Sequence, residues 1–237
     1  MNISLLVTNY KKTHLFKSSL DSIVPQLVEG DEICFVDDAE YDGARELLHS
    51  LPKWISWKYN ITGNKSYRSG CKAKNIALKM SENELCVIND PEVWHYTKCI
   101  DQIKNSFKKD KKLFIVPGSM YSAKDITQDI DVFIHSQENV GYIPHSMAPF
   151  IGGVLRDELF KVGGWDERFK YWGNDDNDLM HRLGLSGCKT YSDDRMIAFH
   201  QWHPRPPQEA MGDANESLLY DKNKSIVANK GVKWGEI

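Results

Sequence analysis

The first half of the chain alternates between short apolar runs and longer segments with helical periodicity. The apolar runs predict strands at residues 3–7, 33–36, 54–57, 85–88 and 113–116. Runs of this length, bounded by polar and turn-forming residues, are typical of strands buried in a sheet. The intervals between most of them are long enough to hold a helix.

These intervals carry apolar residues three and four positions apart. The spacing predicts helices over residues 16–27, 46–48, 69–80 and 100–107. Pro25 lies inside the first of them, so we expect a kink or an early end there. Strands alternating with helices are typical of an α/β fold, and we predict a mostly parallel central sheet flanked by helices.

The second half of the chain has a weaker pattern. Residues 117–150 predict a connection with one strand or helix near residues 132–134, and residues 196–200 predict a late strand. The tail over residues 208–237 is polar, and we expect a helix in it near residues 217–228. The sequence shows no internal repeat and no low-complexity tract, and its 237 residues allow one large domain or two small ones.

Composition narrows the classes of function. Hydrophobic residues make up 41% of the chain and charged residues 27%, which is ordinary for a globular protein. The formal net charge of −3 argues against a strongly basic nucleic-acid surface, though not against a local basic patch, and we expect no nucleic-acid partner. No apolar stretch is long enough to span a bilayer, and the first residues lack the features of a signal peptide. The five cysteines are scattered, which suits reduced thiols in a cytoplasm.

Polar residues follow three of the predicted strands at their carboxyl ends. They are Thr8, Asn9 and Tyr10, then Asp37 and Asp38, and finally Asp90 and Glu92. Ligands of open α/β sheets bind at this edge. The chain has neither a Gly-x-Gly-x-x-Gly sequence nor a P-loop, which argues against a dinucleotide or nucleoside-triphosphate site.

Two of these carboxylates suggest a metal site. Asp90 and Glu92 are separated by one proline directly after a buried strand, and such a pair can hold a divalent cation that in turn binds a diphosphate. His200 and His203 follow the late strand, and a mixed nitrogen and oxygen set suits Mn²⁺. The alternative is that the carboxylates belong to an ordinary turn and the histidines to a strand end.

Two other groups could bind parts of a nucleotide. Asp37 and Asp38 could accept hydrogen bonds from a base or a ribose, or they could form a turn or helix cap. Arg68, Lys72 and Lys74 form a basic cluster at a predicted helix start. They could contact phosphates, or they could be a solvated face of the helix.

An acidic cluster stands out in the second half. Asp175, Asp176 and Asp178 follow the Trp-Gly pair at 172–173, at the start of a plausible helix. Acidic residues stabilise the first turn of a helix, so capping is one interpretation. The other is a rim of carboxylates at a cleft, one of them a catalytic base. The flanking Gly-Gly-Trp at 163–165 and Trp-Gly at 172–173 favour this second interpretation.

The order and spacing of these motifs resemble a family 2-type GT-A glycosyltransferase over about residues 1–205. The matching segments are Ile-Ser-Leu-Leu-Val-Thr-Asn-Tyr at 3–10, Val-Asp-Asp-Ala-Glu-Tyr-Asp-Gly at 36–43, Gly-Cys-Lys-Ala-Lys-Asn at 70–75, Asp-Pro-Glu at 90–92, Gly-Gly-Trp-Asp-Glu at 163–167 and Gly-Asn-Asp-Asp-Asn-Asp-Leu at 173–179. The Trp-Gly pair at 172–173 and the His-x-x-His at 200–203 are similar to the galactosyl- and N-acetylgalactosaminyltransferase branch.

The resemblance implies one Rossmann-like GT-A domain over residues 1–207. Its halves would be a nucleotide-sugar-binding part at 1–116 and an acceptor-binding part at 117–207, and the tail at 208–237 could act as a lid. The resemblance also implies a metal-dependent transferase. Its donor would be a nucleotide-sugar, most simply a UDP-sugar, and its acceptor would be a glycan or another molecule with a free hydroxyl group. The lack of a membrane span then favours a cytoplasmic enzyme of a bacterium or virus.

The resemblance also implies roles for individual residues. Those implied for the donor are Thr8, Asn9, Tyr10, Asp37, Asp38, Arg68, Lys74 and Asp90. Those implied for Mn²⁺ or Mg²⁺ are Asp90, Glu92, His200 and His203. Those implied for the acceptor or the transferred sugar are Gly153, Trp172, Gly173 and Asp175. Those implied for catalysis are Asp176 and Asp175, with Asp176 as the general base of an inverting transfer.

Three other functions use the same residue types. A retaining transferase on this scaffold would use the acidic cluster only to position substrates. A sugar-nucleotide or glycan-binding protein would bind the same ligands without turnover. A nucleotidyltransferase would also need paired carboxylates and a metal, but the sequence has no glycine-rich triphosphate loop.

Overall fold

A computed structural model shows the fold of the chain. It describes residues 1–38, 41–63, 70–124, 141–144, 150–170, 173–204, 213–221 and 225–236. Three features named above fall outside these ranges: Arg68, Trp172 and the expected element at 132–134.

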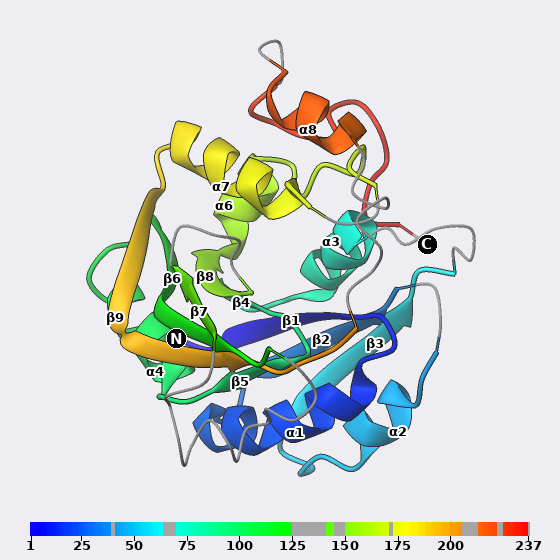
Figure 1. Cartoon of the computed structure of the whole chain (residues 1–237), viewed down its shortest axis with the longest axis vertical. Coiled ribbons are helices and arrows are strands. Elements are labelled where there is room, and N and C mark those ends of the chain that lie inside the picture. Colours follow the sequence, from blue (N-terminus) through cyan, green and yellow to red (C-terminus); the bar gives the residue numbers. More distant parts are fainter. Residues whose placement is uncertain are drawn as a thin grey trace.

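The described strands form one nine-stranded sheet (Figure 1). Its parallel half consists of β3 (Ser56–Ile61), β2 (Glu32–Asp37), β1 (Ile3–Asn9) and β4 (Leu85–Asn89), in that spatial order. Three of these strands were expected from buried apolar runs. The fourth, β3, begins later than the predicted run at 54–57, because it is an edge strand in which polar and apolar residues alternate.

The other half of the sheet mixes directions. It contains β8 (Ile151–Leu155), β6 (Leu113–Ser122), β9 (Lys189–His200) and β5 (Val93–His95), with β7 (Gly141–Pro144) paired to β6. β6 and β9 run parallel, whereas the pairs β4–β8, β6–β8, β6–β7 and β5–β9 are antiparallel. The late strand predicted at 196–200 is the end of the longer β9, whose first part is polar and mostly exposed.

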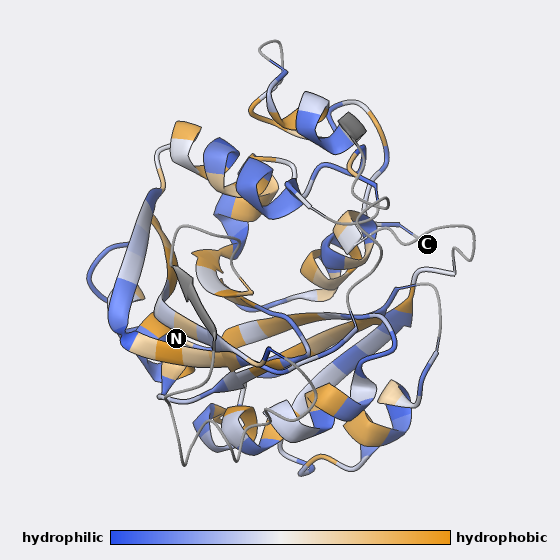
Figure 2. Ribbon diagram, viewed as in Figure 1, coloured by the Kyte–Doolittle hydropathy of each residue, from blue (hydrophilic) through white to orange (hydrophobic). Residues whose placement is uncertain are grey.

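Helices cover both faces of the sheet. One face carries α1 (Thr13–Ile23), α2 (Ala44–His49) and α4 (Cys99–Phe107), and the other carries α3 (Gly70–Met80), α6 (Arg156–Lys161) and α7 (Asp175–Leu185). Successive residues of β1 point to opposite faces, so Leu5 and Val7 join the first core whereas Leu6 joins the second. Figure 2 shows the apolar residues concentrated on the strands between these layers.

One helix end agrees with the sequence-based expectation, and the helix in the tail differs from it. α1 ends at Ile23, and Pro25 lies in a short 3-10 turn, η1 (Val24–Gln26), so the early end at this proline is confirmed. In the tail, α8 (Asp213–Leu219) begins before the helix expected at 217–228 and also ends before it does. Among the described residues, no helix combines the length and apolar character needed to cross a membrane.

Gly153 lies inside the sheet, opposite Val87 on β4 and Ile115 on β6. A side chain there would overlap Ile103 and would approach within 2.9 Å of Ile115. The structure therefore gives Gly153 a packing role between β8 and α4, and does not bring it to the acidic cluster.

We predict that Gly153→Ala lowers the free energy of unfolding by about 1–3 kcal/mol, because the added methyl group overpacks this layer. Urea denaturation followed by circular dichroism measures the loss. Gly184→Ala is the matched control, since Gly184 lies in α7 with open space around it and should gain about 0.5–1 kcal/mol. Equal effects of the two changes would contradict the packing role.

Candidate active site

The candidate site lies where β1, β2 and β4 end, and the last residues of β9 and the first turn of α7 approach the same edge (Figure 1). The parallel register sets this arrangement, because it places Asn9 beside Asp37. The site has three parts, which are a hydrogen-bonded network at β1 and β2, a histidine and glutamate cluster after β4, and the acidic cluster of α7.

In the first part, Asn9 and Asp37 form a buried network. Asn9 Nδ2 donates to Asp37 Oδ1 at 2.7 Å and to Asp42 Oδ1 at 2.9 Å. The hydroxyl of Tyr59 donates to Asp37 Oδ2 at 2.5 Å. Burial, partly offset by these hydrogen bonds, raises the pKa of Asp37 to about 6. Both oxygens of Asp37 are thus engaged inside the protein, where they hold the ends of β1, β2 and β3 together.

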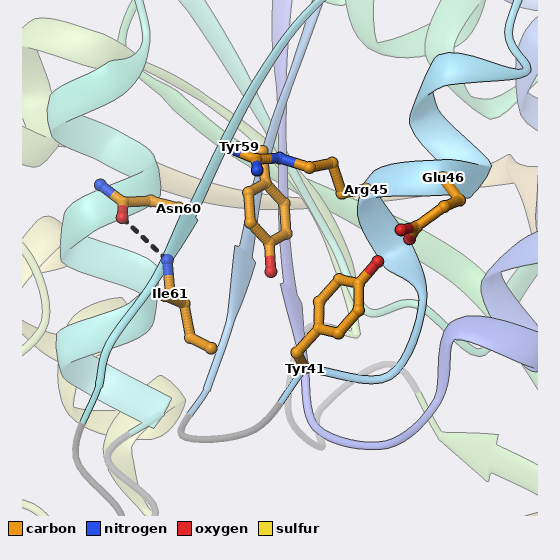
Figure 3. A pocket seen from close by; sticks show the side chains of 6 residues that line it. All are labelled: Tyr41, Arg45, Glu46, Tyr59, Asn60 and Ile61. Atoms are coloured by element: carbon orange, nitrogen blue, oxygen red, sulfur yellow. Dashed lines mark hydrogen bonds between the residues drawn. The ribbon is translucent and has the colours of Figure 1, made fainter.

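The neighbouring Asp38 is also buried and accepts a 3.2 Å hydrogen bond from the hydroxyl of Thr62. Thr8 and Tyr10 lie on either side of Asn9 and are partly exposed. A pocket of about 500 Å³ opens beside this network. It is lined by Tyr41, Arg45, Glu46, Tyr59, Asn60 and Ile61 (Figure 3).

Arg45 and Tyr59 give this pocket its polarity. The guanidinium carbon of Arg45 lies 5.3 Å from the centre of the Tyr59 ring, within the range of a cation–π contact. Tyr41 is half exposed, and Figure 3 shows its ring as part of the same lining. The pocket therefore offers aromatic surface, the cation of Arg45 and the carboxylate of Glu46 next to the Asp37 network.

In the second part, the structure brings Glu92, His200 and His203 together. Their ligand atoms all lie within 4.8 Å of one another. His203 Nε2 is 3.0 Å from Glu92 Oε1, and His200 Nε2 is 3.3 Å from the same oxygen. Burial acts to raise the pKa of Glu92, but the two histidines and Lys12 together hold it well below its usual value. One carboxylate with two imidazoles suits Mn²⁺ or a similar ion.

The other oxygen of this carboxylate, Glu92 Oε2, is buried and has no hydrogen-bond partner among the described residues. An unpaired buried carboxylate oxygen is costly, so the site is suited to receive a cation. Lys12 is a member of this cluster that the sequence did not reveal. Its Nζ lies 2.5 Å from Glu92 Oε1, although the two residues are far apart in the chain. The only sequence signal was its place after the first polar strand end.

Asp90 links this cluster to the acidic one. Its backbone N–H donates to the carbonyl of Phe150 at 2.8 Å, which fixes the turn after β4. Burial, followed by the charge of Glu92, raises the pKa of Asp90 to about 8, and Lys74 and Asp176 also act on it. Asp90 does not belong to the close group of Glu92 and the two histidines. It lies within electrostatic reach of both clusters.

In the third part, Lys74 joins the two predicted catalytic carboxylates. Its Nζ lies 2.8 Å from Asp175 Oδ2 and 2.7 Å from Asp176 Oδ1. The indole N–H of Trp165 donates to the same oxygen of Asp176 at 3.1 Å. Lys74, predicted to meet phosphates, is thus engaged by the acidic cluster.

The two carboxylates differ in their acidity. Burial raises the pKa of Asp176, which Lys74 only partly offsets. For Asp175 the charge and hydrogen bond of Lys74 outweigh burial, and the pKa is lowered. A carboxylate with a raised pKa is the better proton acceptor of the two, provided that it remains ionised.

The start of α7 places these carboxylates. Gly173 and Asn174 both have positive φ angles, of 99° and 67°, and turn the chain sharply into the helix. Asp178, the third carboxylate of this turn, forms a buried ion pair with Arg182, at 2.7 Å. Arg182 also donates to the carbonyl of Val162 at 2.8 Å, which anchors the helix to the preceding loop.

The Gly-Gly-Trp-Asp-Glu loop at 163–167 is held by α3 and by the tail. The Asn75 side chain accepts from the Trp165 backbone N–H at 2.8 Å and donates to the Trp165 carbonyl at 2.8 Å. Asn229 donates to the same carbonyl at 2.7 Å and to that of Gly163 at 2.8 Å. The described tail residues 225–236 therefore support the loop that carries Trp165.

Comparison with known proteins identifies the family. The sequence model described as "Glycosyl transferase family 2" matches residues 4–153, which is more than half of the chain. The chain belongs to glycosyl transferase family 2. A second model, "N-terminal domain of galactosyltransferase", matches residues 135–203. Together the two matches span both halves of the sheet.

Relatives of this family 2 protein are distant. Chondroitin synthase of Escherichia coli is 22% identical over 254 residues, which covers 91% of this chain and 37% of the relative. The chain thus spans little more than a third of that relative's length.

Solved structures have the same GT-A fold. GalNAc-T7, in complex with UDP, GalNAc and Mn²⁺, superposes with a TM-score of 0.67 at 13% identity, over 92% of this chain and 47% of that one. The mannosyltransferase PcManGT from Pyrobaculum calidifontis, in complex with GDP-Man and Mn²⁺, gives 0.58 at 17% identity, over 88% and 58%. The α/β fold expected from the sequence is confirmed.

We predict that Asp37→Asn changes how stability depends on pH. Because the pKa of Asp37 is about 6 in the folded protein and near 3.8 in the unfolded chain, the folded state binds the proton more tightly. The contribution of the Asp37 carboxyl group to the free energy of unfolding therefore falls by about 3 kcal/mol in all as pH rises from 4 to 6. The variant avoids this loss, so its stability relative to wild type should rise across that window.

Urea denaturation at pH 4, 5, 6 and 7 measures this difference. Asp157→Asn, on the exposed side of α6, is the control and should track wild type at each pH. A stability difference between Asp37→Asn and wild type that stays constant with pH would contradict a raised pKa.

Proposed function

We propose that this chain transfers a sugar from a nucleotide-sugar, most simply a UDP-sugar, to an acceptor hydroxyl with inversion at the anomeric carbon. One observation carries the proposal. A cluster suited to a divalent cation and a cluster with a basic carboxylate lie at one edge of the sheet, with Asp90 in electrostatic reach of both. Family membership and the nucleotide-sugar complexes of GalNAc-T7 and PcManGT support it.

The nucleoside would bind at the ends of β1, β2 and β3. Thr8, Tyr10 and Asp38 border this region, and the adjoining pocket offers the rings of Tyr41 and Tyr59 for contact with a base. Asp37 would act indirectly, since its oxygens already bind Asn9 and Tyr59. Its role would be to hold the strand ends at the spacing that the nucleoside requires.

Glu92, His200 and His203 would hold Mn²⁺ or Mg²⁺, and the unpartnered Glu92 Oε2 fits this role. When bound, the ion would supply positive charge that stabilises the leaving diphosphate. Asp90, beside this cluster, would complete the ligands or orient the donor sugar.

Asp176 would take the proton from the acceptor hydroxyl as that hydroxyl attacks the anomeric carbon. Trp165 and Lys74 both hold Asp176 Oδ1, which leaves Oδ2 to accept the proton. Asp175, Trp172 and Gly173 would border the acceptor. The tail at 208–237 would close over the bound donor, supported through its contacts with the loop at 163–167.

A retaining transfer is the second candidate, and one observation favours it. Lys74 forms ion pairs with both Asp175 and Asp176, as expected if the two carboxylates serve only to position substrates. The products separate the two mechanisms. A screen of nucleotide-sugars with Mn²⁺, read by nucleotide release, identifies the donor. NMR of the product then gives the anomeric configuration, and retention would overturn the inverting proposal.

We predict that Asp176→Asn lowers kcat by about 10²–10⁴-fold, because it removes the proton acceptor. UDP affinity, measured by calorimetry with Mn²⁺ present, should stay within about twofold, since the donor site lies outside this cluster. The exposed Asp157→Asn serves as the surface control and should leave both quantities unchanged. Transfer by Asp176→Asn at near wild-type rate would show that another group is the base.

A further inference from the structure

Hydrogen bonds hold the backbone of Lys12, and its side chain reaches toward Glu92. Its backbone N–H donates to Asn9 Oδ1 at 3.0 Å, and its carbonyl accepts from Leu15 and Phe16 in the first turn of α1. Lys11 before it has a φ of 56°, so the chain turns sharply between β1 and α1. The Lys12 side chain is 20% exposed, and its polar contacts with described residues are made by the ammonium at its tip.

That tip lies inside the cluster that would hold a metal. Lys12 Nζ is 2.5 Å from Glu92 Oε1 and 3.2 Å from His203 Nε2. It thus engages two of the three side chains in the cluster, while Glu92 Oε2 stays buried and unpartnered among the described residues. The ammonium neutralises the carboxylate but leaves one of its oxygens unsatisfied.

The ammonium and a divalent cation cannot share this position. Both are positive and both need Glu92, and an ammonium donating to His203 Nε2 occupies the lone pair that a metal would use. A lysine side chain can swing through several rotatable bonds while its backbone stays in place. Because the backbone of Lys12 lies in the short turn between β1 and α1, its displaced ammonium would still lie at the donor edge of the sheet.

We propose that Lys12 is an internal counter-ion of the metal site, which a divalent cation displaces and which then binds the diphosphate of the donor. This inference rests on the proposed function. The exchange makes the empty site stable, since Glu92 is never left as an isolated buried charge. It also couples the two ligands, because the arriving metal releases the cation that the diphosphate needs.

The exchange predicts that Lys12→Met raises the affinity for Mn²⁺ and lowers the affinity for UDP. This change nearly keeps the length of the side chain and removes its charge. Without the competing ammonium, the full chain should bind Mn²⁺ about tenfold more tightly in the absence of nucleotide. Electron paramagnetic resonance of free Mn²⁺ measures this directly. With saturating Mn²⁺, the affinity for UDP should fall about tenfold by calorimetry, because one phosphate contact is lost.

The experiment has two control variants. Lys17→Met removes an exposed charge from the same helix and should change both affinities by less than about twofold. Glu92→Gln should abolish Mn²⁺ binding in this range, which establishes that the titration reports this site. Thermal melting of each variant shows that it is folded.

Several results would overturn the inference. Unchanged or weaker Mn²⁺ binding by Lys12→Met would show a purely structural ion pair, as would both affinities moving in one direction. UDP binding that needs Lys12 but no Mn²⁺ would show that the ammonium replaces the metal. The Mn²⁺ titration requires no turnover, so its result stands apart from the donor screen. If no nucleotide-sugar is used, the proposed function fails while the displacement of Lys12 by a metal can still be observed.

Discussion

Charges buried at one edge of the sheet need partners, and this requirement organises the site. Lys74 lies between Asp175 and Asp176, Lys12 meets Glu92, and Asn9 with Tyr59 satisfies Asp37. A lone buried charge would be strongly destabilising, so each carboxylate fixes the position of its partner. The strand ends, α3 and α7 are therefore held together by polar contacts as well as by the two apolar cores.

Much of the fold could be predicted because central parallel strands are buried on both faces. β1, β2 and β4 are rich in apolar residues and are buried along almost their whole length. The prediction of strand bounds from sequence was less accurate for strands that have one face exposed to solvent. β3 was placed too early, and the polar first part of β9 was missed, because alternating or polar residues give no apolar run. Neighbouring strands, rather than local sequence, settle those boundaries.

The sequence also placed several site residues close together, although their order in space came from the sheet. Glu92, His200 and His203 were grouped by chemical type, and β5 beside β9 brings them within reach of one another. Lys12 was missed because its partners lie far along the chain. Lys74 was expected beside phosphate, but its charge meets two carboxylates, a contact that no local pattern encodes.

Lys74 and Asn75 are consecutive residues of α3 and therefore point in directions about 100° apart around its axis. One side chain meets the carboxylates of α7, and the other holds the loop that carries Trp165. Gly164 has no side chain, and any added carbon would overlap the Asn75 amide. A rotation of α3 would break both sets of contacts at once. One turn of α3 therefore positions both the start of α7 and the loop that carries Trp165.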